Sequence, residues 1–420
     1  MAEKQNTPEI RFEGFTDPWE QRKFSDVAVI RRGLTYSPTS IVDGADGVRV
    51  LRSANINEDH FVLNDDDVFV DKGAVNIDLV HDGDILITAA NGSPRLVGKR
   101  ARISDLPGRT VHGGFMLVAS SPCSDFLCAS MGSSWYRRFL ATGVAGGNGA
   151  IGNLDSKALG ETTIAVPNDA EIDKLGNFFT RLDSLITLHQ RKYDKLCTVK
   201  KSLLDKMFPK PGETEPEIRF EGFTDPWEQR KLSAIATMHA RIGWQNLRTS
   251  EFLDDGDYLL ITGTDFTDGA VDYANCHYVE RSRYEQDSNI KLQNGSILIT
   301  KDGTLGKVAF VQGLPKPSTL NAGVFNVLVR NQNEVDSRYL FHYLRGPYLM
   351  DYVDQRSTGG TIKHLNQNIL VDFPVILPEL KEQKALGRLL TELDRLITLH
   401  QRKLELLKNT KKSLLDKMFA

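Results

Sequence analysis

Cysteine and long apolar runs are both scarce in this sequence of 420 residues. Its four cysteines, Cys123, Cys128, Cys197 and Cys276, form no CxxC pair and no zinc-finger spacing, so we expect reduced thiols and no metal site. No apolar run approaches the roughly 18 residues of a membrane span, so no membrane partner is expected. The opening residues MAEKQNTPEI lack the apolar core of a signal peptide, which makes the cytoplasm the expected location.

The sequence also lacks the short signatures of common enzymes. GTLGK at 303–307 does not have the spacing of a P-loop, and GVAGGNGAIG at 143–152 does not lead from a strand into a helix as a dinucleotide fingerprint must. There is no Asn/Asp-Pro-Pro-aromatic tetrad, no GxSxG or HExxH, and no paired-carboxylate nuclease pattern. We therefore expect no catalytic residue, and no metal ion or cofactor bound by this chain.

A marked excess of either charge is lacking as well. The chain has 52 Lys and Arg against 55 Asp and Glu, a net charge of −3, whereas a small nucleic-acid-binding domain is usually basic. This argues only mildly against DNA binding, because a local basic face is enough to meet phosphates. An apolar fraction of 40% and a charged fraction of 25% are typical of globular proteins, and the length predicts two or more domains.

What the sequence does contain is an internal duplication. PEIRFEGFTDPWEQRK occurs at 8–23 and again at 216–231, and a second, nearly identical pair of segments begins at Leu182 and at Leu393. The bodies between them, 24–166 and 232–377, share only short patterns such as GDILIT and GSILIT. PKPGETEP at 209–216 reads as a linker. This contrast favours a common frame that holds two different recognition surfaces.

The second repeated pair predicts two long helices. Pro167 and Pro378 precede them, Asn168 or Asp169 can cap the first, and Glu171 and Asp173 suit its positive end. Their apolar residues step by four and three, as in a coiled coil, over about 40 residues and about 60 Å. The expected seam comprises Leu182, Ile186, His189, Tyr193, Leu196, Leu203, Met207, Leu393, Ile397, His400, Leu404, Leu407, Leu414 and Met418.

Such a stripe needs a partner, and the twin helix of the same chain is the first choice, in antiparallel orientation about a pseudo-two-fold axis. Pairing between two chains is the alternative. His189 and His400 fall on the stripe and are expected to be packed rather than to bind a ligand. The outward residues of LHQRK and KKSLLDK match too. Either both helices present one surface to two copies of a partner, or the duplication is recent.

Each body is predicted to be a mixed α/β globule. We expect strands at 48–56, 83–88, 258–266, 295–300 and 307–311, and helices at 135–140 and 337–353. Glycine-rich loops with amide, hydroxyl and basic side chains join them, at 30–36, 52–55, 89–103, 141–154, 240–248, 301–311 and 357–368. Amide side chains pair with adenine, Arg and Lys with guanine, and backbone N–H groups with phosphate.

These loops supply the candidate DNA-binding residues, although such loops are also common as plain turns. In the first half the candidates are Arg31, Arg32, Asn55, Asn91, Ser93, Arg95, Lys99, Arg100 and Asn148. In the second half they are Arg241, Gln245, Asn246, Arg248, Lys301, Thr304, Lys307, Lys363 and Asn366.

Taken together, these features resemble the specificity (S) subunits of type I restriction–modification systems. The resemblance rests on the duplicated plan of body and helix, on GDILIT with its GKR and on GSILITKDGTLGKVA, on EQK after Pro378, and on the LDxLITLHQRK…KKSLLDKMF helices. It covers nearly the whole chain. The first half departs from the family pattern, with NGSPRLVGK in place of a GT-G loop and NDAEIDKL at its helix start.

The resemblance implies a division of labour. Two α/β target-recognition domains, 8–166 and 217–377, would each read one half of a bipartite site in double-stranded DNA. The antiparallel helices, 167–208 and 378–420, would space the half-sites and bind two methyltransferase subunits, which use S-adenosylmethionine. Two restriction subunits, which use ATP and Mg²⁺, would join them, and this chain would be non-catalytic. A specificity subunit of another restriction type, a coiled-coil adaptor that does not bind DNA and a self-contained enzyme are the alternatives.

Overall fold

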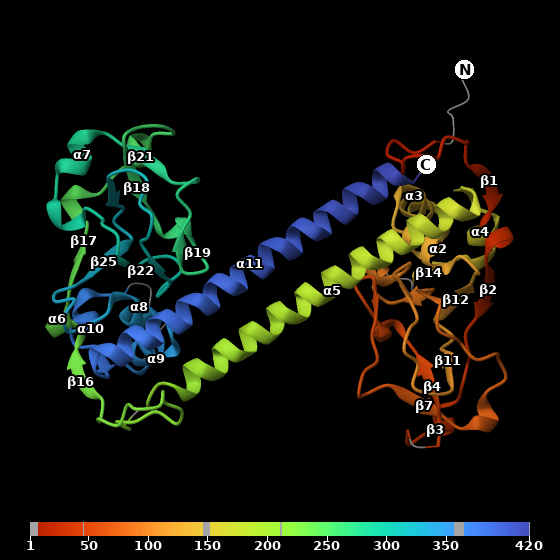
Figure 1. Ribbon diagram of the computed structural model, residues 1–420, viewed down its shortest axis with the longest axis horizontal. Coiled ribbons are helices and arrows are strands. Elements are labelled where there is room, and N and C mark those ends of the chain that lie inside the picture. Colours follow the sequence, from red (N-terminus) through yellow and green to blue (C-terminus); the bar gives the residue numbers. More distant parts are fainter. Residues whose placement is uncertain (1–6, 45, 146–151, 211, 357–364, 420) are drawn as a thin grey trace. The chain divides into compact units, whose positions relative to one another are not determined.

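The structure is a computed structural model that describes residues 7–44, 46–145, 152–210, 212–356 and 365–419. Its contacts divide the chain into two compact units (Figure 1). Unit 1 comprises residues 1–190 and 402–420, and unit 2 comprises residues 191–401. Each unit therefore contains one body and a part of both long helices. None of the described helices is both long and apolar enough to cross a membrane.

The body of unit 1 is built mainly on two four-stranded sheets. Its elements are β1 (Glu20–Lys23), α1 (Phe24–Val27), β2 (Val29–Arg32), β3 (Ile41–Val42), β4 (Val48–Leu51), β5 (Ile56–Asn57), β6 (His60–Phe61), β7 (Val68–Val70), β8 (Ile85–Thr88), β9 (Ala90–Asn91), β10 (Arg100–Arg102), β11 (Thr110–His112), β12 (Met116–Ser120), α2 (Ser124–Ser130), α3 (Ser134–Gly143), β13 (Val144–Ala145), β14 (Gly152–Leu154), α4 (Ser156–Glu161) and β15 (Thr163–Val166). One sheet has the antiparallel order β10-β8-β12-β2, and the other has the order β11-β4-β7-β3 with β11 and β4 parallel.

The body of unit 2 repeats this plan. Its elements are β16 (Glu228–Lys231), α6 (Leu232–Ile235), β17 (Ala236–Ala240), β18 (Tyr258–Ile261), β19 (Phe266–Thr267), β20 (Ala270–Val271), β21 (His277–Val279), α7 (Arg281–Glu285), β22 (Ile297–Thr300), β23 (Val308–Phe310), β24 (Ser318–Leu320), β25 (Val324–Val329), α8 (Ser337–Arg345), α9 (Pro347–Arg356), α10 (Gln367–Val371) and β26 (Pro374–Leu377). The order β17-β25-β22-β23 matches β2-β12-β8-β10 of unit 1, and β21-β18-β24 matches β7-β4-β11. The mixed α/β prediction is confirmed for both bodies.

Most predicted elements are present, but three are interrupted. The strand expected at 48–56 turns after β4, because the side chain of Asn55 accepts a hydrogen bond of 2.7 Å from the N–H of Arg52. The strand expected at 258–266 turns likewise, where Asp265 accepts from the N–H of Thr262 at 2.7 Å. The helix expected at 337–353 is divided into α8 and α9, because a proline follows Gly346 and lacks the N–H that would continue the helix.

The long helices have the predicted extent. Helix α5 spans Asp169–Lys206 and α11 spans Leu380–Met418, which are 38 and 39 residues. Asn168 caps α5, since its side-chain oxygen accepts a hydrogen bond of 3.0 Å from the N–H of Glu171. Within unit 1 the two helices run antiparallel, because Phe179 contacts Phe419 while Asp183, further along α5, pairs with Lys411 at 2.6 Å. In unit 2 Lys200 of α5 pairs with Asp394 of α11.

The stripe predicted as a seam is covered within these units. Buried positions are Leu182, Ile186, His189, Met207, Leu393 and Met418, and half-buried positions are Tyr193, Leu196, Leu203, Ile397, His400, Leu404, Leu407 and Leu414. The stripe also carries Lys200 and Lys411, which bind Asp394 and Asp183. These contacts join two helices of the same chain, which is the pairing that we favoured over pairing between two chains. Charged pairs at such positions fix the register of a coiled coil.

The repeated segments place aromatic rings in the core of each body. In unit 1 the ring of Phe419, just beyond α11, packs with its centre 6.1 Å from the ring centre of Trp19 and 5.6 Å from that of Phe126. In unit 2 the ring of Phe208, just beyond α5, packs with its centre 6.1 Å from the ring centre of Trp227 and 5.8 Å from that of Tyr339. Each opening segment and each KMF helix end thus contributes an aromatic ring to a body core.

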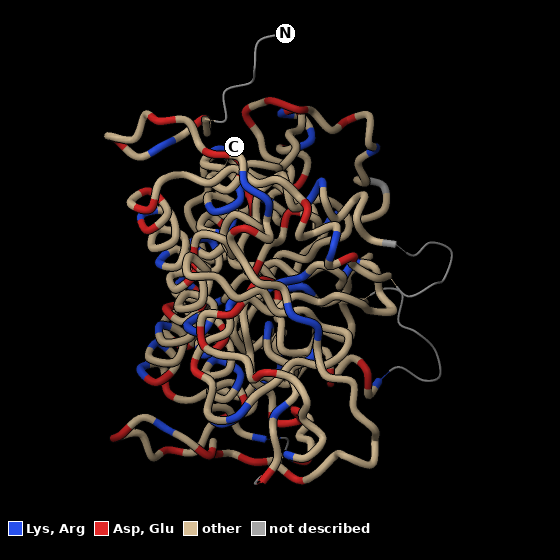
Figure 2. The backbone as a smooth tube through the Cα atoms, turned by 90° about the vertical axis from the view of Figure 1, so that its right-hand side faces the viewer, with Lys and Arg blue, Asp and Glu red and all other residues tan. Residues whose placement is uncertain are grey.

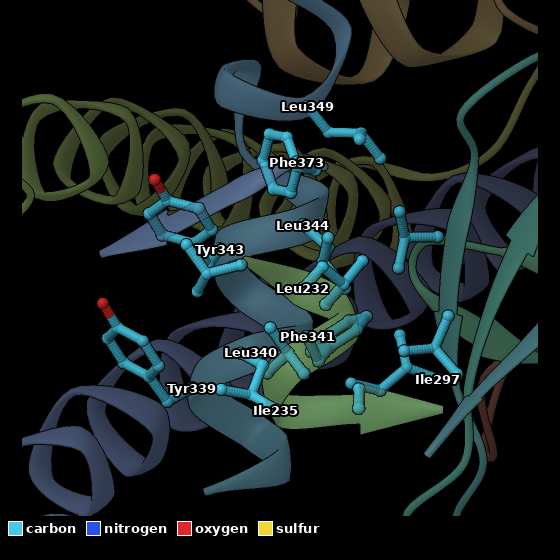
Figure 3. Packing of buried hydrophobic residues seen from close by; sticks show 14 of the residues in the cluster. Leu232, Ile235, Ile297, Tyr339, Leu340, Phe341, Tyr343, Leu344, Leu349 and Phe373 are labelled. Atoms are coloured by element: carbon cyan, nitrogen blue, oxygen red, sulfur yellow. The ribbon is translucent and has the colours of Figure 1, made fainter. Parts of the chain in front are cut away.

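Helix α8 supplies much of the remaining unit 2 core. The side chain of Asp336 caps it by accepting hydrogen bonds from the N–H groups of Arg338 and Tyr339. Leu340 and Leu344 of this helix lie beside Ile235 and Leu232 of α6 (Figure 3). This packing fixes α6 at the start of β17, which is the strand that leads into the first candidate loop of unit 2.

Candidate nucleic-acid interface

Each unit has a cleft at the ends of the strands that carry the predicted loops. The cleft of unit 1, here the first cleft, has a volume of about 730 Å³. Its lining residues follow β2, β4 and β8 or lie at the start of β12: Leu34, Thr35, Tyr36, Arg52, Ser53, Ala90, Asn91, Gly92, Gly113, Gly114, Phe115 and Met116. The second cleft, in unit 2, has about 440 Å³ and is lined by Ala240, Arg241, Ile242, Gly243, Asn246, Lys301, Asp302, Ala322, Phe325, Leu365, Asn366 and Gln367.

The two clefts occupy equivalent places in the duplicated fold. The N–H of Ala89 donates to the carbonyl of Phe115 at 2.9 Å, and the N–H of Lys301 donates to the carbonyl of Gly323 at 2.9 Å. The neighbouring backbone matches as well, since the N–H of Gly113 donates to the carbonyl of Leu51 as the N–H of Asn321 donates to that of Ile261, both at 2.9 Å. The backbone frame is therefore shared, while the side chains that line the clefts differ.

A glycine makes the first cleft possible. A Cβ on Gly33 would lie 1.9 Å from the carbonyl oxygen of Gly113, which no side chain can tolerate. The residue after β2 therefore crosses directly against the turn between β11 and β12. This close approach places Tyr36 and Phe115 at the same cleft.

The loop after β22 is held by its own hydrogen bonds. The hydroxyl of Thr300 accepts from the N–H of Lys307 at 2.9 Å and donates to the carbonyl of Thr304. Gly303 and Gly306 have φ values of +73° and +70°, which is the left-handed region that favours glycine. Lys301 lies at the start of this loop and its amine stands 5.6 Å from the ring centre of Phe325. These contacts hold the loop whose first residues, Lys301 and Asp302, line the second cleft.

Four candidate residues are buried, although one of them, Arg241, also lines the second cleft. Asn55 is fully buried and donates to Asp67 at 2.7 Å, and Arg100 is buried with its Nε donating to the carbonyl of Cys128. Arg241 is 1% exposed. Its guanidinium binds the carbonyls of Leu320 and Gln245 and the side chains of Gln286 and Thr319, and burial lowers its pKa. The fourth, Gln245, is buried beside it.

These four side chains support the loops, because their donors are already used by the protein. Arg31 is a milder case: it is half-buried and binds Asp84 at 2.7 Å and the carbonyl of Leu79. The sequence could not reveal this, since an arginine that braces a loop and one that contacts a base have the same neighbours along the chain.

Four of the other described candidates line the clefts. Asn91 lines the first cleft, and Asn246, Lys301 and Asn366 line the second. The remaining ones, on the same or adjoining segments, are Arg32, Ser93, Arg95, Arg248, Thr304 and Lys307, which are exposed, and Lys99, which is half-exposed. Asn148 and Lys363 lie outside the described residues. Direct contact with DNA stays a prediction for this set.

The structure adds lining residues that sequence reasoning did not single out. Tyr36, Arg52 and Gln367 fall within flagged loops, but nothing in their local sequence distinguished them. Arg52 donates to the carbonyl of Asp66 at 3.1 Å, and its Nε is buried without a hydrogen-bond partner among the described residues. Phe115 lies in HGGFM, a stretch with no polar signal, and only its exposure of 67% reveals it.

Acidic and basic residues are mixed along much of the backbone and are not gathered in separate regions (Figure 2). Among the described lining residues, Arg52 is the charged side chain of the first cleft, whereas Arg241, Lys301 and Asp302 line the second. The described residues contain no group of three or more His, Cys, Asp or Glu side chains placed to hold a metal ion.

Comparison with known proteins shows which proteins the chain resembles. Residues 224–409 match the family model described as Type I restriction modification DNA specificity domain. The Type I restriction enzyme EcoKI specificity subunit of Escherichia coli is 25% identical over 403 residues, which are 89% of this chain and 82% of that one. Residues 224–409 thus match a type I specificity domain, and over most of its length the chain is similar to a type I specificity subunit. The resemblance that the duplicated helices and loops predicted is thereby confirmed.

Two relatives from Methanocaldococcus jannaschii match shorter stretches. The putative MjaX specificity subunit is 29% identical over 203 residues, 47% of this chain and 46% of that one. The MjaVIII specificity subunit is 20% identical over 274 residues, 63% of each chain. The matches thus span about half and somewhat under two thirds of these relatives. A crystal structure of a type I S subunit from M. genitalium has a TM-score of 0.60 at 16% identity and covers 99% of both chains, which shows the same fold.

Proposed function

We propose that this chain is the DNA sequence-recognition subunit of a type I restriction–modification complex, in which each unit reads one half of a split site. The observation that carries the proposal is the pair of equivalent clefts. They share one backbone frame, yet one is lined by Tyr36, Arg52 and Phe115 and the other by Lys301, Asp302 and Asn366. A chain that bound one ligand twice would need like linings, whereas a chain that reads two different sequences needs unlike ones.

The proposed division of labour follows the repeat. The bodies 8–166 and 217–377 recognise DNA, and the helices 167–208 and 378–420 set the spacing of the half-sites. A fixed spacing converts two modest half-site affinities into one strong, distance-selective interaction. Half-sites about one helical turn apart, about 34–36 Å, present the same face of the DNA. Contacts to phosphates make such binding weaken steeply with salt.

The helices also offer a surface for partner subunits. Leu188 in α5 and Leu399 in α11 occupy the same place in the repeated LITLHQRK segment, and they are 46% and 51% exposed. Identical exposed apolar residues on both helices fit two copies of one methyltransferase subunit. That subunit would bring S-adenosylmethionine, and restriction subunits would bring ATP and Mg²⁺, so that this chain supplies no catalytic residue. Such a complex would act on DNA in the cytoplasm.

Mapping of methylated bases tests this proposal. The chain is co-expressed with the methyltransferase encoded beside it, in a host that lacks adenine methylation, and modified adenines are located by long-read sequencing. We expect one split motif that disappears when this chain is omitted. Methylation that is absent, or the same without the chain, would refute the proposal and favour an adaptor that does not bind DNA. The matched control is a chain with Leu406→Asn, a change at an exposed helix position that keeps the clefts intact.

A further inference from the structure

Phe115 presents an aromatic ring to solvent at the first cleft. It lies at the turn between β11 and β12, lines the cleft and is 67% exposed. A phenyl ring left in water forgoes the stabilisation that burial would give it. Its position at the first cleft makes this ring available to a ligand that enters the cleft.

The backbone of Phe115 is fixed by the surrounding strands. Its carbonyl accepts hydrogen bonds from the N–H groups of Ala89 at 2.9 Å and Ala90 at 3.0 Å. On the side of β11, the N–H of Gly113 donates to the carbonyl of Leu51 at 2.9 Å, and the carbonyl of Gly113 accepts from the N–H of Met116 at 2.8 Å. The ring is thus carried by a rigid turn, which suits a contact that must discriminate between bases.

Unit 2 has no ring at the equivalent position. The backbone hydrogen bond from Lys301 identifies Gly323 as the counterpart of Phe115. A Cβ on Gly323 would lie 3.8 Å from a carboxylate oxygen of Asp302. The shared frame therefore presents an aromatic ring in one unit and a carboxylate in the other, so this position differs in kind between the two clefts.

The neighbours of the ring favour the edge of a base pair as its target. Asn91, Ser53 and Arg52 line the same cleft, and such amide, hydroxyl and guanidinium groups are typical of contacts in the major groove. The apolar feature of the major groove is the C5-methyl group of thymine, which apolar side chains including Phe contact. We propose that Phe115 is a specificity-determining residue that recognises the methyl group of a thymine in the half-site read by unit 1.

This proposal rests on the proposed function and deepens it, and its test uses the motif found by methylation mapping. Duplexes carry that motif with each thymine replaced, one at a time, by deoxyuridine, which lacks only the methyl group. Binding is measured for the complex of the full chain with its methyltransferase. We expect a loss of about fourfold at one thymine, the value of one buried methyl group, and only in one half of the motif.

The same duplexes are then bound by the Phe115→Ala and Phe115→Leu complexes. Phe115→Ala should bind the thymine and deoxyuridine duplexes equally at that position, while Phe115→Leu should keep part of the difference. Gly323→Ala is the matched control at the equivalent turn, and it should leave the dependence on the methyl group unchanged. Because the ring is exposed, these variants should melt at the temperature of the wild type.

Three results would overturn the proposal. The wild type could be indifferent to every deoxyuridine, Phe115→Ala could retain the full loss, or Phe115→Ala could weaken binding to all duplexes alike, as expected for a wedge between base pairs. In each case the complex still binds its motif, so the proposed function stands. A chain that directs methylation to no motif would instead refute the proposed function itself.

Discussion

A buried glutamate stands in the first turn of each long helix and holds the repeated opening segment. Glu171 binds Arg11 through two hydrogen bonds of 2.7 and 2.8 Å, and it accepts a third from Trp19. Glu382 binds Arg219 at 2.9 and 2.8 Å. The negative charge also lies near the positive end of the helix. These contacts give a structural reason for the arginine in both copies of PEIRFEGFTDPWEQRK.

Replacing Arg219 by Met should destabilise unit 2 by about 3 kcal/mol, because it leaves the carboxylate of Glu382 buried and unpaired. The free energy of unfolding is measured by denaturant titration. Adding Glu382→Gln should restore a part of the loss. The control is Arg395→Met, whose pair with Glu392 is exposed, and it should cost less than about 1 kcal/mol. An equal effect of the two arginine changes would contradict this interpretation.

The stability of unit 2 should depend on His342. Burial, followed by the positive charges of Lys200 and Arg345, lowers the pKa of this histidine to about 2. Its Nε2 lies 3.1 Å from the hydroxyl of Thr391. Below the ordinary pKa of 6.5 the unfolded chain binds a proton that the folded chain does not, so stability falls as the pH falls.

Comparison with His342→Gln isolates this contribution. At pH 8 the wild type should be the more stable protein, and its advantage should shrink below pH 6.5 by at most about 1.4 kcal/mol per pH unit. Denaturant unfolding at pH 8, 6.5 and 5 measures the difference. Stability curves that stay parallel across this range would show that the histidine does not titrate on unfolding.

For the clefts, the sequence predicted which loops take part better than it predicted which side chains line them. Most of the loops that line the two clefts were predicted from glycine next to amide and basic side chains, but the turn at 113–115 was not. Both Arg241 and Lys301 line the second cleft, but Arg241 is buried and its guanidinium is used by the protein, whereas Lys301 is only half-buried. Local sequence could not separate them, because burial depends on strands that are distant in the chain. Phe115 was missed because an exposed phenylalanine and a core phenylalanine look alike in a sequence.

At the scale of elements, the helices were the most predictable part. Their apolar repeat is local, so α5 and α11 have nearly the expected lengths. The sheets depend on distant pairs: β1 pairs with β15, with Glu20 opposite Val166, and β16 pairs with β26, with Glu228 opposite Leu377. No local pattern announces such a pairing, and the sheet order could be learned only from the structure.

Replacing Leu196 and Leu407 together by Asn should loosen both parts of the helix pair. Both side chains are half-buried against a body core, so we expect a cost of about 2 kcal/mol for each and degraded recognition of both half-sites. Unfolding and methylation mapping measure these effects. Leu406→Asn, beside Leu407 but 66% exposed, should change stability by less than about 0.5 kcal/mol. Unchanged spacing preference in the double variant would refute the spacer role of the helices.

For the whole molecule, the repeat separates the frame from recognition. The repeated segments provide the arginines of the Arg–Glu contacts, the aromatic ring after each helix and the strands β1 and β16. The segments that differ provide the linings of the clefts. The bodies begin and end beside the same strand pairs, at 24 and 166 and at 232 and 377. A body should therefore fold and recognise its half-site when it is placed between the repeated segments of the other half.

The most direct test of this account is the methylation motif of a chain that carries the second body twice. Residues 232–377 replace residues 24–166, so that both frames hold the same cleft, and modified adenines are mapped beside the wild type. We predict a motif made of two copies of one wild-type half-site, with the other half-site lost. A motif that stays the same as that of the wild type, or that contains neither wild-type half, would contradict independent reading by the two units.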